Sequence, residues 1–459
     1  MTPTLDRRRL AELHAGERER FRRDHPRSHE LAADASRHLL AGVPMAWMRR
    51  WPGDVPVFVA DAVQGRIRDV DGHEYVDLCL GDTGAMGGHA LPAVTAAIAD
   101  RANRGATAML PTADAAAVAG ELARRFGLPA WQFALSATDA NRFALRIARL
   151  ATGRRRILVF DWCYHGTVDE TLVVLGADGR VVPRPGSLGV PVDPAATTAV
   201  VPFNDVPALE VALAGGDIAC VLAEPAMTNI GIVLPEPGFH DALRRLTRAA
   251  GTLLVLDETH TICAGPGGYT AAHGLAPDLL VVGKPIGGGV PAAAYGLSAA
   301  VAAVVRDRFE DPSIDVSGIG GTLAGNALSV AAMDAALAHS LRDEDFAMAV
   351  PLATRFADGA AAVIAGHGLP WHVQQLGCRA EYWFAPPPRD GATAAAAGDA
   401  ELEAYLHLWA LNRGILLTPF HNMALFTPHH APADADLHTD VFDAALTGLF
   451  GSPPYDAVT

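Results

Sequence analysis

The chain has 459 residues, half of them hydrophobic, and a formal net charge of −15 at pH 7. This length suits one large two-lobed unit or about three small domains, and the apolar content excludes wholesale disorder. The acidic balance argues against a nucleic-acid-binding protein, because such proteins usually carry a net basic face.

The first zone of the chain ends at about Leu78 and opens with a charged segment. Residues 5–30, LDRRRLAELHAGERERFRRDHPRSHE, mix both signs of charge, which favours a solvated amphipathic helix that could also pack on a partner subunit. Residues 57–78, VFVADAVQGRIRDVDGHEYVDL, indicate a small β-meander with a hairpin turn at Asp71 and Gly72.

The second zone, residues 79–335, alternates apolar strands with helical stretches. The predicted strands are RRILVFDW (155–162), IACVLAEP (218–225), GTLLVLDE (251–258) and PDLLVVGK (277–284), and PGFHDALRRLTRAAG (237–251) has the spacing of a helix. Continuous apolar strands separated by helices predict a mainly parallel sheet that is covered on both faces. Ligands of such sheets bind at the carboxyl ends of the strands.

The third zone, residues 336–459, contains further helices. It also holds a short strand candidate, CRAEYWFA (378–385), and an alanine-rich stretch, DGATAAAAGDAE (390–401), that suits a loop or a weak helix.

The five cysteines are scattered and form no CxxC pair. We therefore expect reduced thiols in a cytoplasmic protein, with neither a metal site nor a disulfide framework. No early apolar segment indicates secretion, and no apolar run of about 18 residues indicates a membrane span.

Three predicted strands end on polar side chains, namely Glu224, Asp257 and Lys284. The chain has few lysines, so an amine at the end of an apolar strand stands out. Burial disfavours the charged ammonium form, and such an amine can form a Schiff base with an aldehyde. An acid such as Asp257 can keep a pyridine nitrogen protonated, and the pair is that of a pyridoxal phosphate enzyme. Asp257 alone could equally be a helix N-cap.

Two segments could bind the phosphate of such a cofactor. In SATDANRFALRIAR (136–149) small residues precede a helix, whose free N–H groups suit an anion. Ser136 or Thr138, with Asp139, could instead form an ordinary cap. GIGGTLAGN (318–326) also opens onto a helix, and DWCYHG (161–166) offers Tyr164 beside His165 to cover a flat ring, or as an ordinary core aromatic.

Taken together, the motifs resemble a known family. SATDANRFALRIARLATGRRRILVF, CYHG, AEPAMTNIG, LDETHT, VVGKPIGGGVPAAAYG and GGTLAGN, in this order, are similar to the class III (ω-type) aminotransferases, and most of all to their glutamate-1-semialdehyde aminomutase branch. The similarity spans about residues 36 to 450. It implies a fold-type I pyridoxal-phosphate enzyme of the α/β class, with a large domain at 79–335 and a smaller α+β domain built from residues 1–78 and 336–459.

The resemblance also implies roles for individual residues. Lys284 would be the Schiff-base lysine and Asp257 the partner of the pyridine nitrogen. The other implied contacts of the cofactor are Ser136, Ala137 and Thr138 at the phosphate, Tyr164 and His165 at the ring, Asn229 at the phenolic oxygen, and Glu224 and Thr259 in the ring pocket. Thr322 would reach the phosphate of a neighbouring subunit, so a homodimer with sites at its interface, or a larger assembly, is implied.

Some residues depart from the family pattern. The chain reads SATD where the family usually reads SGTE, so Asp139 leaves a gap or room for water, and Thr259 replaces a valine. THTICAG and LAGVPMAW lack the arginine that amino-acid-specific relatives carry. Since a carboxylate prefers a bidentate guanidinium, this puts a carboxylate clamp in doubt. Arg49 and Arg379 are candidate substitutes.

These features lead us to expect a transaminase. It would move an amino group, by a ping-pong mechanism, between a small-molecule amine or amino compound with a distant or absent carboxylate and a keto acid such as pyruvate. Met45, Trp47, Met48, Trp51 and Met86 could line an apolar pocket or form the core of the small lobe. The alternatives are a glutamate-1-semialdehyde 2,1-aminomutase, a β-amino-acid transaminase, and a cofactor-binding protein without turnover.

Overall fold

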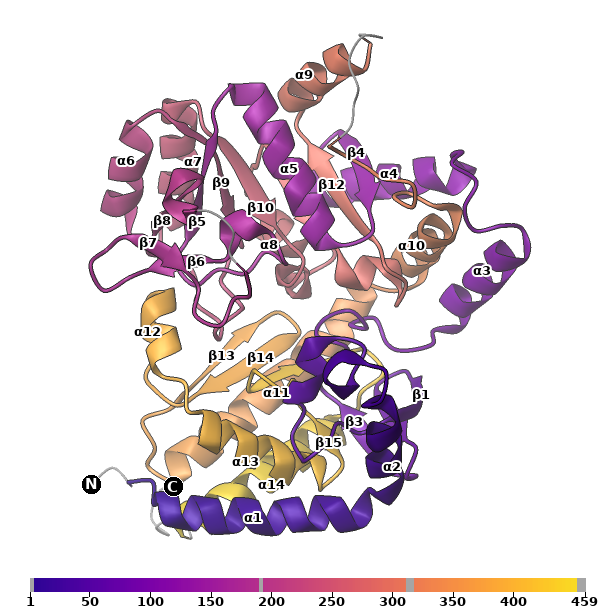
Figure 1. The fold of residues 1–459 in the computed structure, drawn as a ribbon, viewed down its shortest axis with the longest axis vertical. Coiled ribbons are helices and arrows are strands. Elements are labelled where there is room, and N and C mark those ends of the chain that lie inside the picture. The colour runs from indigo at the N-terminus through magenta and orange to yellow at the C-terminus, as the bar shows by residue number, and fades with distance from the viewer. Residues whose placement is uncertain (1–3, 190–192, 311–317, 452–459) are drawn as a thin grey trace.

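The computed structural model of the chain describes residues 4–189, 193–310 and 318–451. Its elements form two parts (Figure 1). A seven-stranded sheet surrounded by helices makes up the upper part, and smaller sheets and helices from both ends of the chain make up the lower part. The predicted α/β architecture, with a smaller lobe built by both termini, is confirmed.

The large sheet has the strand order β4-β12-β11-β10-β9-β5-β8. Strands β8, β5, β9, β10 and β11 are parallel to one another, whereas β12 is antiparallel to both of its neighbours, β11 and β4. The bounds are β4 Ala130–Ala134, β5 Arg156–Phe160, β8 Thr198–Val201, β9 Ile218–Ala223, β10 Leu253–Asp257, β11 Leu279–Val282 and β12 Ala293–Leu297. All four predicted strands are present, but β4, β8 and β12 were not predicted.

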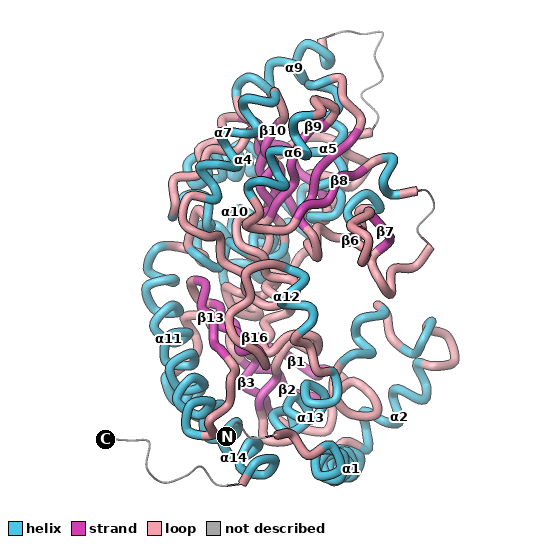
Figure 2. Tube along the Cα trace, turned by 90° about the vertical axis from the view of Figure 1, so that its left-hand side faces the viewer, coloured by secondary structure: helices cyan, strands magenta, loops and turns pink. Residues whose placement is uncertain are grey.

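Helices cover both faces of this sheet (Figure 2). Successive side chains of a strand point to opposite faces. Ile157 and Val159 therefore pack with α5 and α9, while Leu158 and Phe160 pack with α6 and α7. The covering helices are α5 Ala137–Thr152, α6 Val206–Ala214, α7 Phe239–Ala250 and α9 Ala299–Phe309. This two-sided burial explains why the strands read as continuous apolar runs.

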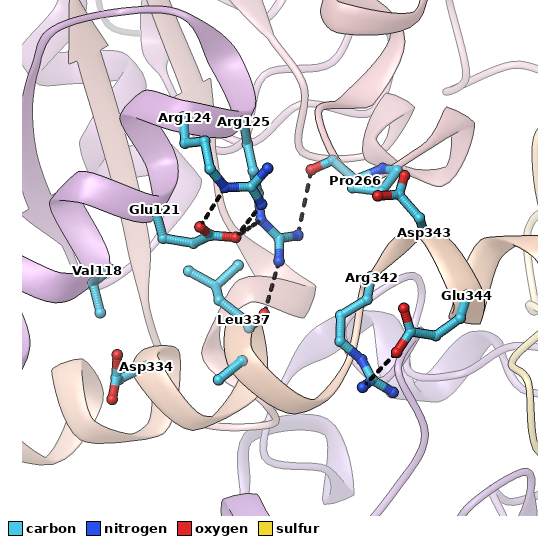
Figure 3. Close-up of a pocket in the computed structure, with 11 residues that line it drawn as sticks. Val118, Glu121, Arg124, Arg125, Pro266, Asp334, Leu337, Arg342, Asp343 and Glu344 are labelled. Atoms are coloured by element: carbon cyan, nitrogen blue, oxygen red, sulfur yellow. Dashed lines mark hydrogen bonds and ion pairs between the residues drawn. The ribbon is translucent and has the colours of Figure 1, made fainter.

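Shorter elements complete the upper part. They are α3 Pro92–Asn103, α4 Ala113–Phe126, α8 Gly268–Ala272, α10 Ala327–His339, the hairpin of β6 Val173–Leu175 and β7 Val181–Pro183, and the 3-10 turns η3 Asp169–Thr171, η4 Pro194–Ala196, η5 Thr261–Ala264 and η6 Lys284–Gly287. Arg125 connects several of them (Figure 3). Its guanidinium donates to the carbonyls of Leu337 at 2.7 Å and Pro266 at 3.4 Å, and pairs with Glu121.

The lower part contains two small sheets. One has the order β1-β2-β3-β15 and the other β13-β14-β16. The strands are β1 Val59–Val63, β2 Arg66–Asp69, β3 Glu74–Asp77, β13 His372–Leu376, β14 Arg379–Trp383, β15 Ile415–Leu416 and β16 Met423–Leu425. The helical elements are α1 Arg7–Asp24, α2 Pro26–Ala35, η1 Leu40–Gly42, η2 Ala46–Arg50, α11 Asp343–Gly366, α12 Gly391–Ala396, α13 Ala400–Leu411 and α14 Pro432–Phe450. The predicted hairpin is confirmed, since β2 pairs antiparallel with β3 and Gly72 in the turn has φ +94°.

The charged N-terminal segment is the helix α1, and it packs on its own chain. Leu10 and Phe21 are buried, and Glu17 pairs with Arg413 just beyond α13 at 3.0 Å. The alanine-rich stretch that suited a loop or a weak helix forms the six-residue helix α12, and Trp383 Nε1 donates to its Ala394 carbonyl at 2.9 Å.

Among the described residues, α11 is long and apolar enough to cross a membrane by length and composition. One face of this helix, including Leu352 and Phe356, is buried in the core cluster that α14 shares, whereas Met348 is exposed. Composition alone therefore does not distinguish this core helix from a membrane span.

The two parts meet through one continuous apolar core and through a close backbone contact. In that contact Cys378 N donates to the Cys263 carbonyl at 3.0 Å, which joins the β13–β14 turn to η5. The neighbouring Gly377 has φ +58°, and a Cβ there would lie 2.0 Å from the Cys263 oxygen. Only glycine fits between these two backbones.

We predict that Gly377→Ala destabilises the protein strongly, because both the left-handed φ and the backbone overlap oppose a Cβ. The apparent midpoint of thermal unfolding, at a fixed scan rate, should fall by about 5 °C or more. Gly72→Ala is the matched control, since Gly72 also has a positive φ but open space around it. Equal shifts in the two variants would contradict the close contact.

Candidate active site

Lys284 lies at the carboxyl end of the sheet, two residues beyond β11. It begins η6 with φ +53°, a backbone conformation that non-glycine residues seldom adopt. Its Nζ lies 2.8 Å from Asp82 Oδ2 and 2.8 Å from His260 Nε2. Lys284 is also the only lysine of the chain, a count that the sequence alone supplies and that is sharper than the expected scarcity of lysines.

Asp82 belongs to a tight loop that follows β3. Leu80, Asp82 and Thr83 have φ of +45°, +51° and +79°, and each such residue costs roughly 1–2 kcal/mol relative to a relaxed backbone. Asp77 holds the start of the loop, because its Oδ1 accepts hydrogen bonds from the backbone N–H groups of Cys79 at 3.0 Å and Leu80 at 2.9 Å. Strain of this kind persists where the surrounding structure enforces it, typically at functional sites.

The Asp82 carboxylate is ionised although it is largely enclosed. Burial opposes ionisation, but the charge of Lys284, with smaller contributions from His260 and His421, holds the pKa of Asp82 well below its usual range. Burial and then the charge of Lys284 lower the pKa of His260 to about 3, so its imidazole is neutral at neutral pH. Asp82 and Lys284 therefore form the charged pair of this corner.

Asp257 is the last residue of β10 and lies next to β11 in the sheet. Its Oδ2 accepts hydrogen bonds from Asn141 Nδ2 at 2.8 Å and His165 Nδ1 at 3.0 Å, and its Oδ1 accepts one from Thr259 N at 3.1 Å. Burial alone would raise the pKa of Asp257, but His165 and the other donors lower it. The carboxylate is thus fixed in position and charge.

His165 carries the positive charge that faces Asp257. Burial would lower the pKa of His165, but Cys163 and the hydrogen-bonded Asp257 raise it to about 10. Its Nε2 is buried and has no hydrogen-bond partner among the residues that the structure describes. The Nε2–H group of His165 is therefore a hydrogen-bond donor without a described acceptor.

The N-terminus of α5 supplies a place for an anion. Ser136 is the N-cap, and its Oγ accepts a hydrogen bond from Asp139 N at 3.2 Å. The loop after β5 closes over this end, because Thr167 N donates to Thr138 Oγ1 at 3.1 Å. Gly166 has φ +80°, and a Cβ there would lie 2.1 Å from Thr138 Oγ1, so glycine keeps the loop close to the helix. Unpaired N–H groups at a helix start attract phosphate-like groups.

Many of these groups line one cavity of about 560 Å³, whereas Asp82 and Asn141 lie behind its wall. The predicted residues that the structure brings together in its wall are Trp47, Ser136, Ala137, Thr138, Tyr164, His165, Asp257, Thr259 and Lys284. The rings of Trp47 and Tyr164 lie 5.5 Å apart and form an aromatic side of the wall. Burial raises the pKa of Tyr164 to about 12, so its hydroxyl keeps its proton.

Other predicted residues lie outside the wall. Glu224 is buried and accepts a hydrogen bond from the Thr228 hydroxyl. With its side-chain amide turned by 180°, the orientation that satisfies both of its ends, Asn229 accepts a hydrogen bond from Arg184 Nη2 at 2.7 Å. Thr322 is exposed on the loop before α10, and Met45 is 46% exposed beside the mouth. These residues can act only from behind the cavity, at its rim, or across an interface.

Three candidates for the substrate pocket are placed elsewhere by packing. Met86 is buried in the hydrophobic core, where the short connection after β3 holds it among apolar side chains. Arg49 is exposed in η2 and does not line the cavity. Arg379 is buried and already paired, with Nη2 at 2.8 Å from the Thr228 carbonyl and 3.1 Å from Glu381. It is a structural arginine here.

Sequence reasoning missed Asp82, His260 and Asn141. A signal existed for two of them: Asp82 stands in the glycine-rich run GDTGAMGG after a strand, and His260 follows the strand end LLVLDET. Asn141 lies one turn inside α5, and only the structure shows that its side chain reaches Asp257.

Comparisons with known proteins agree with this geometry. A family model described as aminotransferase class-III matches residues 47–356. The chain is 36% identical over 413 residues to a glutamate-1-semialdehyde 2,1-aminomutase of Chloroflexus aggregans, covering 87% of this chain and 92% of that relative.

Solved structures are similar as well. A glutamate-1-semialdehyde-aminomutase from Pseudomonas aeruginosa PAO1 superposes with a TM-score of 0.95 and 49% identity, covering 97% of this chain and 99% of the other. A lysine-to-alanine variant of that protein was solved in complex with PMP. An omega-transaminase from Sphaerobacter thermophilus superposes with a TM-score of 0.83 and 29% identity, covering 92% and 97% of the two chains.

We predict that the stability gained from His165 declines in alkali. A raised pKa gives a contribution that is complete below the unfolded pKa of about 6.5 and is lost as the pH rises through about 10. The difference in unfolding midpoint between the wild type and His165→Gln should therefore shrink from pH 7 to pH 10. His438 is the control, because burial lowers its pKa to about 3 and the difference for His438→Gln should stay constant over this range. A constant difference for His165→Gln would refute the charged pair.

Proposed function

The chain belongs to the class-III aminotransferases, and on this premise we propose that it moves an amino group between an amine or amino compound and a keto acid such as pyruvate. Enzymes of this family depend on pyridoxal phosphate, and the chain has their fold-type I architecture. The observation that carries the proposal is the cavity that places Lys284, Asp257 and the start of α5 around one space.

The residues of the cavity fit pyridoxal phosphate. Lys284 Nζ would bind the aldehyde carbon, the ionised Asp257 would bind the protonated ring nitrogen, and the cradle of Thr138 and Gly166 would hold the phosphate. Thr259 Oγ1 and His165 Nε2 are buried without a partner among the described residues, so both remain available to a group in the cavity. Further supporting roles follow the predicted assignment: Ser136 and Ala137 at the phosphate, Tyr164 over the ring, and Glu224 and Asn229 behind it.

When bound, pyridoxal phosphate accepts the electron pair of the substrate carbon. Lys284 Nζ would take the proton from that carbon and return it to the former aldehyde carbon of the cofactor, acting as base and then as acid. Asp257 keeps the ring nitrogen positive, and the aromatic wall of Trp47 and Tyr164 excludes water from one side. Two half-reactions at one site make the kinetics ping-pong.

The charges around the cavity support a substrate whose carboxylate is distant or absent. No arginine lines the cavity within the part of the chain that the structure describes, and Arg379 is committed to Glu381. Asp82 adds a negative charge beside Lys284. The described wall therefore offers no guanidinium to the carboxylate of an amino donor, and a keto acid such as pyruvate would need a partner outside that wall.

A second candidate is a glutamate-1-semialdehyde 2,1-aminomutase. The relatives that bear this name at 34–37% identity, and the structure at 49% identity, support it. Such an enzyme moves the amino group within one molecule and needs no keto acid. Its substrate carries a carboxylate, so in this chain that group would need a partner other than the described wall of the cavity.

The assembly proposed for the active form is a homodimer in the cytoplasm. Thr322 is exposed and outside the wall of its own cavity, as a residue that serves the neighbouring site would be. The five cysteines are free and buried, which suits a reducing compartment. Light scattering should give twice the chain mass of 48.0 kDa, and a monomer at micromolar concentration would contradict the dimer. Recovery of the native protein outside the cytoplasmic fraction of its source cells would contradict the location.

The function is tested with a panel of substrates. Purified enzyme loaded with pyridoxal phosphate receives single amines or amino acids, each with and without pyruvate, and alanine formation is followed. The transaminase assignment requires alanine from at least one amine and none without pyruvate. Rapid conversion of glutamate 1-semialdehyde alone, with no alanine from any donor, would favour the aminomutase.

We predict that one residue carries all of the covalently attached cofactor. After loading with pyridoxal phosphate and reduction with borohydride, peptide mass spectrometry should find the adduct on Lys284, because no other side chain of the sequence is a lysine. Lys284→Ala should give no adduct and no measurable turnover while keeping the wild-type circular dichroism spectrum. An adduct at the N-terminal amine instead, or substantial activity of Lys284→Ala, would remove this lysine from the mechanism.

A further inference from the structure

The two groups that contact Lys284 Nζ, Asp82 and His260, have defined hydrogen-bonding roles. An amine of lysine donates to both Asp82 Oδ2 and His260 Nε2, each at 2.8 Å. His260 Nε2 is therefore an acceptor, and the proton of this neutral imidazole is on Nδ1. That proton is donated to Thr83 Oγ1, which lies 3.1 Å away. Thr83 thus fixes the tautomer that lets His260 accept from the lysine.

When Lys284 has given up one proton and acts as a base, the same arrangement directs its lone pair. A neutral amine has two N–H bonds, and Asp82 and His260 accept one each. The lone pair then remains on the side away from both acceptors, and Lys284 itself lines the cavity. An amine held in this way is ready to take a proton from a carbon in the cavity, and Asp82 compensates the positive charge that results.

The surrounding chain holds the acceptors in place. Asp82 and Thr83 sit in left-handed backbone conformations, and Asp77 fixes the loop that carries them. Asp82 Oδ1 is buried without a partner among the described residues, so Lys284 Nζ is the described donor that bonds this carboxylate. His260 belongs to the loop after β10, so two separate loops converge on the amine.

Other charged and titratable groups face this corner from the neighbouring elements. His421, Arg379 and Tyr164 lie close enough to Asp82 to interact with its charge, and Arg379 and Asp257 do so with His260. Glu381 neutralises Arg379 and also bonds His421 Nδ1 at 3.1 Å. Asp82 is therefore the anion that touches the lysine directly.

We propose that Asp82 and His260 are positioning residues for Lys284: they receive its two N–H bonds, aim its lone pair at the cavity, and stabilise the proton that Nζ takes up. The proposal rests on the proposed attachment of the cofactor to Lys284 and deepens it. In the proton step, the C–H bond of the substrate would break, its electron pair would pass towards the bound cofactor, and an N–H bond would form at Nζ. Transfer of that proton from Nζ to the former aldehyde carbon of the cofactor would restore the neutral amine, so no other reactant is needed.

The first test measures charge at Nζ without measuring turnover. The visible absorbance of the loaded enzyme is titrated from pH 5 to pH 10 for the wild type and Asp82→Asn. Asparagine tolerates the left-handed backbone as aspartate does, so the variant removes the charge and keeps the loop. The midpoint should move to lower pH by at least about one unit, since a contacting anion favours the protonated form. Asp61→Asn, which alters an exposed carboxylate in β1, should leave the midpoint in place.

The second test separates orientation from charge. The rate at which 1-phenylethylamine, as probe, changes the visible band in a single turnover is compared for His260→Leu and His260→Gln. Loss of the acceptor in His260→Leu should slow this rate at least about tenfold, because misplaced catalytic groups lose rate steeply. The amide oxygen of His260→Gln can accept the same hydrogen and should restore most of it. Equal rates in the wild type and His260→Leu would overturn the role of His260.

A third measurement tests the positioning role separately from the proposed attachment of the cofactor to Lys284. Biosynthetic labelling with ¹³Cε-lysine gives the apoenzyme a single ε-methylene NMR signal, because Lys284 is the only lysine. The pH profile of this signal should move to lower pH in Asp82→Asn and stay unchanged in Asp61→Asn. A loaded enzyme without a visible band would refute the proposed attachment. An unmoved profile in Asp82→Asn would refute the positioning role, whether or not the cofactor binds.

Discussion

The parallel pairing of β10 with β11 is the constraint on which the site depends. Asp257 pairs with Val281 in this register, and Lys284 follows three residues further along the chain. Parallel strands end at the same edge of a sheet, so two residues that are 27 positions apart meet at one cavity. The helices that return the chain also begin at this edge, which brings the free N–H groups of α5 to the same place.

Pairing of buried charges sets the chemistry of this edge. Asp257 is held by His165 and Asn141, and Lys284 is held by Asp82. An unpaired charge in an enclosed site would shift to its neutral form, whereas a partner at hydrogen-bond distance keeps it ionised. For the same reason Arg379 is not available to bind a substrate carboxylate, because Glu381 already neutralises its charge. The acid and the amine are thus held at the site, and the Arg379 guanidinium is already paired with Glu381.

Much of the fold and part of the site could be read from the sequence. The apolar strands β5, β9, β10 and β11 and the amphipathic α7 were found, since each of these strands reads as a nearly unbroken apolar run. Strands β4, β8 and β12 have similar lengths but a weaker pattern, because Gln132 interrupts β4, β8 begins with Thr198, and β12 is rich in alanine and glycine. Met86 could have lined the pocket or formed the core, and the structure places it in the core; one methionine in a glycine-rich loop does not show which way it faces.

The sequence by itself determined which residue can bind an aldehyde, because the chain has a single lysine, and that residue stands at the end of an apolar strand with an acid 27 positions before it. Only the tertiary structure decided what surrounds that lysine. Asp82 and His260 come from two separate loops. These loops touch through Thr83 and His260, which are 177 residues apart in the sequence, and no local pattern links them. Local composition fixes which strands and helices form, but the neighbours of a side chain depend on how those elements pack, and packing joins residues that are distant in the chain.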